Sequence, residues 1–172
     1  MIELREIGVS DFDRVDRILD RLTSYSLAVD GVPKMHNAAC HFLTARPPNT
    51  SASAKKTFEV VWQGEPVGLV DLIQGYPESK VAFIGLLAIA ENRQRRGIGR
   101  ATFAAVQAYA LKNLGARKLR LAVVSTNDVE GFWTRMGFQR TGEVRPYQGE
   151  KVKGYATILE KDLSRMSPND RQ

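Results

Sequence analysis

The sequence predicts an α/β protein, with a mixed α+β sheet at its centre and helices packed against it. Val81 to Ala90 is almost uniformly apolar, which is typical of a central strand buried on both faces. A glycine turn and a long amphipathic stretch follow, with Phe103, Val106 and Ala110 at helical spacing. The next apolar run, Lys118 to Ser125, is expected to lie parallel to the first strand, because a helix separates the two.

The N-terminal part predicts one strand and two helices. Met1 to Glu6 alternates enough for a strand, and a helix is expected from Ser10, where a hydroxyl and early acids suit a helix start. Its apolar residues recur at helical spacing and predict one buried stripe: Phe12, Val15, Ile18, Leu19 and Leu22. A second helix is expected to begin at Pro33 and to end before Pro47.

Two hairpins complete the predicted sheet. The first joins strands at Thr57–Trp62 and Val67–Gln74, and the second joins Phe138–Arg145 to Lys153–Glu160 through a turn at Pro146–Gly149. A short helix is expected from Val129 to Met136. With no internal repeat, residues 1–165 are interpreted as a single domain and 166–172 as a frayed tail.

The composition indicates the kind of ligand and the compartment that suit the protein, but it does not indicate a reaction. Lys and Arg outnumber Asp and Glu by 25 to 19, a formal charge of +6, which suits a polyanionic ligand or simply a soluble basic surface. No apolar run reaches membrane-spanning length, and no signal-peptide pattern is present. A single cysteine, Cys40, excludes an internal disulfide, so a cytoplasmic setting is the default. His36 and His41 lie five residues apart and do not share a helix face, so no metal site is predicted.

The glycine turn at Gln94–Gly99 predicts a phosphate or pyrophosphate site. A helix begins there, and a helix start carries unpaired backbone N–H groups and the positive end of the helix dipole. Gly97 and Gly99 allow a bulky ligand to approach the backbone closely. Positive charge surrounds the same turn, from Arg93, Arg95, Arg96 and Arg100.

Three types of glycine loop compete for this turn. A Walker loop needs Lys-Ser/Thr after its last glycine, where this chain has Arg100-Ala101. A dinucleotide loop needs a third small residue and an acid about twenty residues on, where this chain has Thr102 and the basic run Arg117–Arg120. The turn resembles instead the coenzyme A pyrophosphate loop of the GNAT superfamily of N-acetyltransferases, Gln/Arg-x-x-Gly-x-Gly/Ala.

A second segment, Asn127–Phe138, resembles the other GNAT signature, with Phe132-Trp133 and Gly137-Phe138 in the matching places. The resemblance spans about Thr57 to Leu159. It implies a mostly antiparallel sheet whose fourth and fifth strands splay apart, with acetyl-CoA as cosubstrate between them. The residues that it implies for binding acetyl-CoA are Leu87, Ala88, Ile89, Gln94, Arg95, Arg96, Gly97, Ile98, Gly99, Arg100, Ala101, Asn127, Phe132 and Trp133.

The implied reaction is direct attack of a neutral amine on the thioester. A backbone N–H at Leu87 or Ala88 is the expected oxyanion donor. Relatives often protonate the leaving thiolate with a tyrosine where this chain has Trp133, so Tyr147, Tyr76 or solvent is expected to replace it. Asp71 interrupts an apolar strand, and burial would raise its pKa towards that of a useful base. A merely structural Asp71, capping a loop or pairing an arginine, remains the alternative.

The sequence therefore predicts an acetyl-CoA-dependent N-acetyltransferase, without a metal, that acts on a primary amine of a small molecule or peptide. Two other functions stay open: a catalytically silent CoA-binding sensor and a basic nucleic-acid-binding module. The nucleic-acid interpretation is disfavoured because the arginines cluster at one turn without interleaved aromatic residues. The acceptor amine is not encoded in any recognisable motif, and dimerisation through the last strands is left undecided.

Overall fold

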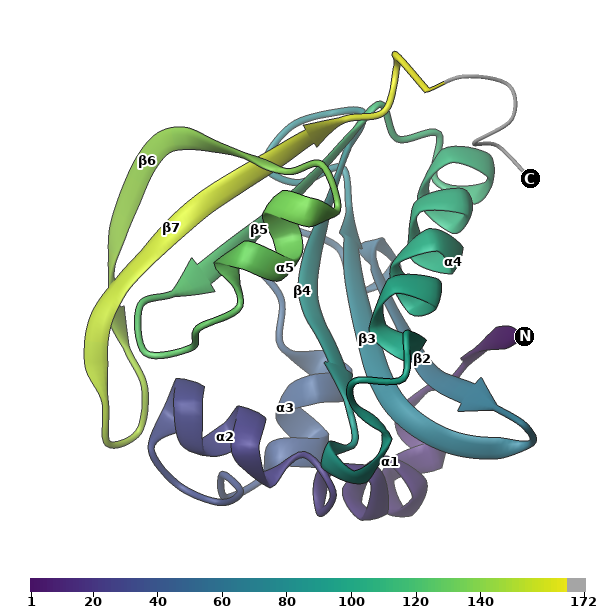
Figure 1. Ribbon diagram of the computed structural model, residues 1–172, viewed down its shortest axis with the longest axis vertical. Helices are drawn as coiled ribbons and strands as arrows, with labels where there is room; N and C mark the ends of the chain where they lie inside the picture. The colour runs from purple at the N-terminus through teal and green to yellow at the C-terminus, as the bar shows by residue number, and fades with distance from the viewer. Residues whose placement is uncertain (167–172) are drawn as a thin grey trace.

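The computed structural model describes residues 1–166, and it contains a mixed sheet of seven strands (Figure 1). The strand order is β1-β2-β3-β4-β5-β7-β6. Every neighbouring pair is antiparallel except β4 and β5, which are parallel, so the expected mostly antiparallel sheet is confirmed. The strands are β1 (Ile2–Glu6), β2 (Lys55–Trp62), β3 (Glu65–Gln74), β4 (Val81–Ile89), β5 (Lys118–Val124), β6 (Gln139–Gln148) and β7 (Lys153–Asp162). Apart from Met166, the expected tail lies outside the described residues.

Helices cover both faces of this sheet. The α-helices are α1 (Phe12–Leu19), α2 (Thr23–Asp30), α3 (Ala38–Thr44), α4 (Ile98–Asn113) and α5 (Glu130–Arg135), and the short 3-10 helices are η1 (Val9–Asp11), η2 (Ala52–Ala54) and η3 (Glu91–Arg93). Within residues 1–166, none of the helices combines the length and the apolar character that crossing a bilayer requires.

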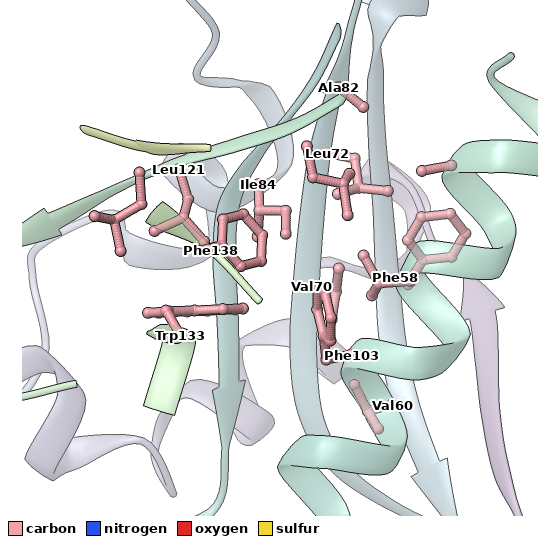
Figure 2. Packing of buried hydrophobic residues seen from close by; sticks show 14 of the residues in the cluster. Phe58, Val60, Val70, Leu72, Ala82, Ile84, Phe103, Leu121, Trp133 and Phe138 are labelled. Atoms are coloured by element: carbon pink, nitrogen blue, oxygen red, sulfur yellow. The ribbon is translucent and has the colours of Figure 1, made fainter. Parts of the chain in front are cut away.

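The larger core lies between the sheet and helices α4 and α5. Figure 2 shows Phe103 of α4 and Trp133 of α5 on the same face as strand residues such as Ile84 and Leu121. The second core packs α1 and α3 against the opposite face, through Val15, Ile18 and Phe42 among others. Two apolar layers therefore hold the central strands β3 and β4 from both sides, as their nearly continuous apolar sequences predict.

The predicted N-terminal helices are partly wrong. The chain forms α2 at Thr23–Asp30, where no helix was expected, and α3 begins at Ala38 rather than Pro33. Gly31, with φ +76°, ends α2, and Asn37, with φ +59°, precedes α3, so two left-handed residues bound the connection between them. Phe12, expected in the buried stripe, stands at the beginning of α1 and is 43% exposed.

The last hairpin also differs from the prediction. β6 continues to Gln148, so Pro146 lies in a strand and pairs with Tyr155, and the turn follows Gln148. β6 is the edge of the sheet, so one side of it has no partner strand. A proline, which has no backbone N–H, can therefore lie there without the loss of a hydrogen bond between strands. The register between β6 and β7 shifts between Arg140 and Val144, so this hairpin is irregular as well as exposed.

The close pairing of β3 and β4 leads to a test at Gly68, which faces Ile89 in the register. A Cβ at Gly68 would overlap the carbonyl oxygen of Ala88 and crowd the Ile89 side chain. We expect Gly68→Ala to lower the free energy of unfolding by about 1–3 kcal/mol, as overpacking does. Gly8→Ala is the control, because a Cβ there meets nothing within 4 Å. Equal stability of the two variants in chemical denaturation would contradict this description.

Candidate active site

The strands β4 and β5 separate half-way along their length. They pair only from Val81 with Lys118 to Ile84 with Leu121. Beyond that point β4 stays paired with β3 as far as Ile89, while β5 stays paired with β7 as far as Val124. Figure 1 shows the two strands diverging above α2. The splay that the resemblance implied is therefore present, and each strand keeps an inner edge without a strand partner.

A β-bulge in β4 marks the start of this opening. Asp71 of β3 pairs with Leu86 and the next residue, Leu72, pairs with Ile84, so Gly85 is left without a partner in the ladder. A Cβ at Gly85 would overlap the Asp71 carboxylate. Any larger residue at this position would therefore have to displace that carboxylate.

A cavity of about 480 Å³, which we call the splay cleft, fills the opening. Its walls come from the parted ends of β4 and β5, from α2 and α5, and from the β6–β7 hairpin. The residues predicted to bind acetyl-CoA that line it are Leu87, Ala88, Ile89, Gln94, Asn127, Phe132 and Trp133. Trp133 is buried and packs edge-on against Phe132, Phe103 and Phe138.

The glycine loop stands at one end of the splay cleft. Gln94 donates a hydrogen bond from Nε2 to the carbonyl oxygen of Ile89 at 2.9 Å, which fixes the loop to the end of β4. Arg95 and Gly97 both have positive φ, at +59° and +77°, and α4 starts at the next residue, Ile98. The N-terminus of α4 has no side-chain cap, and a Cβ at Gly97 would point into open space. Unpartnered N–H groups therefore face outward there.

The other predicted loop residues, Arg95 to Ala101, continue from Gln94 without lining the cleft itself. Among residues 1–166, Arg95, Arg96 and Arg100 take part in no ion pair. A cationic ring around an uncapped helix start favours an anion with several charges.

A second cavity, of about 400 Å³, lies between β3–β4 and helices α1, α2 and α3; we call it the helix cavity. Apolar side chains form most of its wall, including Leu22, Phe42 and Phe83, and Asp71 and Lys55 face it. Five residues line both cavities, so these residues form the boundary between the two: Tyr25, Val29, Gly85, Leu86 and Tyr147.

Comparison with known proteins decides the family. The acetyltransferase (GNAT) family matches residues 19–138, which include both parted strands, the glycine loop and α5. The chain belongs to the GNAT acetyltransferase family. Membership of this family supports acetyl transfer in general, and the predicted fold and family are confirmed. No curated protein matches the chain.

Solved structures support the assignment of the GNAT fold. An acetyltransferase from Thermus thermophilus is 25% identical, with a TM-score of 0.69 over 95% of this chain and 97% of that one. The ribosomal-protein-S18-alanine N-acetyltransferase of Escherichia coli is 17% identical, with a TM-score of 0.70 and 98% of each chain covered. A spermidine N-acetyltransferase SpeG chimera from Vibrio cholerae and hSSAT is 17% identical, with a TM-score of 0.68 over 95% of this chain and 96% of that one.

In this member of the GNAT family, Asp71 is buried and ion-paired. Its Oδ2 accepts a hydrogen bond from Lys55 Nζ at 2.8 Å, and the Lys55 side chain is only 5% exposed. Burial raises the pKa of the Asp71 carboxyl above its ordinary value, and the Lys55 ammonium opposes that rise. The partner is thus a lysine from the adjacent strand, where the sequence offered an arginine as the structural alternative.

Of the two predicted tyrosines, Tyr147 lies at the boundary between the cavities and Tyr76 lies outside both. The hydroxyl of Tyr147 donates to the carbonyl oxygen of Val29 at 2.7 Å. Burial raises the pKa of Tyr147, and the negative charge of Asp30 adds to the rise. Tyr76 packs edge-on against Phe83 and lines neither cavity. The structure therefore keeps Tyr147 near the site and removes Tyr76 from it.

Sequence reasoning missed two residues of this site, Tyr25 and Lys55. Tyr25 lies on α2, the helix that was not predicted, and Lys55 lies before Thr57, where the strand was expected to begin. The sequence contained one indication of Lys55: a carboxylate such as Asp71 inside an apolar strand is costly to bury unless a cation pairs with it.

The Asp71–Lys55 ion pair predicts how a substitution of Lys55 changes the pKa of Asp71. Lys55→Met removes the ammonium that opposes desolvation, so we expect the pKa of Asp71 to rise further above 3.8 than in the wild type. The folded protein then holds this proton more tightly than the unfolded chain. Protonated Asp71 therefore adds to the free energy of unfolding at low pH. This contribution is lost as the pH rises through the pKa of Asp71 in the folded protein.

Carbon-13 NMR titration of labelled aspartate carboxyls measures this pKa directly. Lys56→Met is the matched control, since no hydrogen bond or ion pair joins Lys56 to Asp71 in the structure. An Asp71 pKa that is the same in wild type and Lys55→Met would show that the ion pair is not maintained in solution.

Proposed function

We propose that the protein transfers the acetyl group of acetyl-CoA to a primary amine of a small molecule or peptide. The observation that carries this proposal is that two cavities of different character meet at one boundary. The splay cleft follows an unpaired strand edge to a cationic loop, and the helix cavity is largely apolar and contains one buried carboxylate. Direct transfer requires two bound substrates to meet in this way.

The residues along the splay cleft fit the coenzyme. The pantetheine arm carries amides that can pair with the free edge of β4 at Leu87, Ala88 and Ile89 in the manner of an added strand. Main-chain N–H groups of Arg95–Arg100, at the uncapped start of α4, would hold the pyrophosphate, whereas the N–H of Ala101 already donates to the carbonyl oxygen of Gly97 at 3.0 Å. Asn127, Phe132 and Trp133 would flank the arm from the other side. When bound, acetyl-CoA supplies the activated acetyl group.

The residues at the boundary fit the transfer itself. In the proposed roles, the backbone N–H of Leu87 stabilises the developing oxyanion and Asp71 accepts the proton of the amine. A carboxylate whose pKa is raised is a stronger base than an exposed one. Tyr147 would protonate the leaving thiolate only after its hydroxyl had left Val29, and solvent is the other source of that proton.

We further propose the setting of this enzyme. The single continuous sheet supports treating residues 1–165 as one domain. The proposed chemistry uses no metal, and a single exposed thiol, Cys40, fits the cytoplasm. If the protein dimerises, the exposed edge strand β6 is the surface that we expect a second copy to use.

The glycine loop provides a test of coenzyme binding. Gly97 and Gly64 both have φ near +80°, and a Cβ at either meets nothing within 4 Å, so Glu strains the two backbones alike. Gly97→Glu places a side chain and a negative charge where the pyrophosphate is expected. We expect it to weaken acetyl-CoA binding at least tenfold in isothermal titration calorimetry, with Gly64→Glu unchanged. Equal affinity of the two variants would remove the loop from the site.

Asp71 provides a test of the proposed base. General base catalysis contributes about 10²–10⁴-fold, so Asp71→Asn should lower kcat/KM by about that factor. The wild-type kcat/KM should fall as the pH drops through the Asp71 pKa, because the protonated acid cannot accept the amine's proton, and the variant should lack this acidic limb. Thermal melting of both proteins checks that the unpaired Lys55 leaves the fold intact. An unchanged kcat/KM and an unchanged pH profile would exclude Asp71 as the base.

A catalytically silent CoA sensor is the second candidate function. Trp133 stands where relatives carry a tyrosine, and the Tyr147 proton is committed to Val29, which together favour it. The release of free thiol from acetyl-CoA in the presence of a panel of primary amines separates the two. Thiol release that depends on both substrates supports the enzyme, while tight CoA binding without any release supports the sensor.

A further inference from the structure

Tyr25 occupies a distinctive place at the boundary between the two cavities. Of the five boundary residues, only Tyr25 and Tyr147 have a side chain that can donate a hydrogen bond. The Tyr147 proton is already donated to the carbonyl oxygen of Val29. Within the part of the chain that the structure describes, the Tyr25 hydroxyl makes no hydrogen bond. Tyr25 is therefore the side-chain donor at this boundary that remains free for a ligand.

The helix that carries Tyr25 is held by hydrogen bonds at both ends. At its start, the backbone N–H of Ser24 donates to the Glu91 carboxylate, which belongs to η3 just before the glycine loop. At its end, the carbonyl oxygens of Val29 and Asp30 accept from Tyr147 and from the N–H of Lys151 at 2.7 Å each. These contacts link α2 to the glycine-loop side and to the β6–β7 hairpin.

These hydrogen bonds decide where Tyr25 lies, because α2 contributes little to the core. Val29 is the one buried residue of this helix. The α2 segment also lacks the apolar stripe that would fix its rotation by burial alone. Tyr147 lines the splay cleft, and Glu91 lies three residues before Gln94, which also lines it, so Tyr25 is positioned relative to that cleft.

The acid–base properties of Tyr25 favour a donor over an acid. Burial raises the pKa of the Tyr25 phenol above its ordinary value of 10, and the proximity of Tyr147 and Asp30 raises it further. The phenol therefore stays protonated at any pH at which the protein works. A thiol has an ordinary pKa of about 8.5, so complete proton transfer from this phenol to a thiolate is uphill.

We propose that Tyr25 is a catalytic residue that donates a hydrogen bond to the sulfur of the thioester as it leaves. The inference rests on the proposed function. The nitrogen of the amine forms a bond to the acetyl carbon, the carbon–sulfur bond breaks, and its electron pair stays on sulfur. Asp71 takes the proton of the amine, solvent protonates the released thiolate, and Tyr25 keeps its own proton throughout.

The expected effect of removing the hydroxyl follows from the strength of such a bond. A hydrogen bond to a charged group corresponds to about a 10- to 150-fold effect. Tyr25→Phe should therefore lower kcat by that factor and leave KM for acetyl-CoA within about threefold, since the charge on sulfur develops only in the transition state. Tyr155→Phe is the matched control, because Tyr155 is 61% exposed and lines neither cavity.

A second measurement needs no acceptor amine. We expect the thiol of CoA bound to the wild type to titrate at a lower pH than the thiol of free CoA, because a donor stabilises the thiolate. In Tyr25→Phe the bound thiol should titrate at a higher pH than in the wild type. Ultraviolet absorbance of the thiolate, with tyrosinate absorbance subtracted, follows both titrations, and circular dichroism checks the fold of each variant.

The outcomes separate the two proposals. Failure of the wild type to bind acetyl-CoA or CoA overturns the proposed function, and this inference with it. If CoA binds, a bound thiol that titrates like free CoA in the wild type overturns the inference alone, even if Tyr25→Phe does not fold. A fall in kcat without a change in the thiol titration also overturns it, because Tyr25 would then act somewhere other than on sulfur.

Discussion

The parting of β4 and β5 is the constraint on which the rest of this structure depends. Parallel pairing ends at Ile84 and Leu121, yet both strands continue, because β3 and β7 hold them from outside. Unpaired backbone groups at an inner sheet edge are costly unless something satisfies them. The bulge at Gly85 begins the opening and turns the same stretch of β4 towards the Asp71 carboxylate. One local irregularity thus connects a cleft for an extended ligand to a cavity with a buried base.

Helix α2 closes the opening that the strands leave. It is fixed less by burial than by hydrogen bonds to Glu91 on one side and to Tyr147 and Lys151 on the other. These contacts come from elements far apart in the sequence: η3, just before the glycine loop, and the β6–β7 hairpin, which walls the splay cleft. A shift of the glycine loop or of the hairpin is therefore expected to move Tyr25. The splay cleft and the helix cavity meet where they do because this helix is held from both ends.

Much of this architecture was predictable from local sequence patterns, and the exceptions have physical causes. The strands beside the glycine loop, the loop and α4 follow from apolar runs and helical spacing, and Asp71 stood out as a carboxylate in an apolar strand. Helix α2 was missed because its tertiary hydrogen bonds, rather than an apolar stripe, fix it. Lys55 was missed because its contact with Asp71 depends on the register of β2 against β3. Pro146 predicted a turn, but the edge position of β6 accommodates it in a strand.

The central claim is that the free edge of β4 receives an extended ligand as an additional strand. Amide hydrogen exchange resolved by residue, with and without acetyl-CoA, tests it most directly. The account predicts that amides of Leu87–Ile89 not already bonded to β3, together with amides of the glycine loop, become protected on addition of acetyl-CoA. Amides of Val81–Ile84, already enclosed by β3 and β5, should change little. Protection that appears elsewhere, with exchange in Leu87–Ile89 and the loop unchanged, would contradict the account.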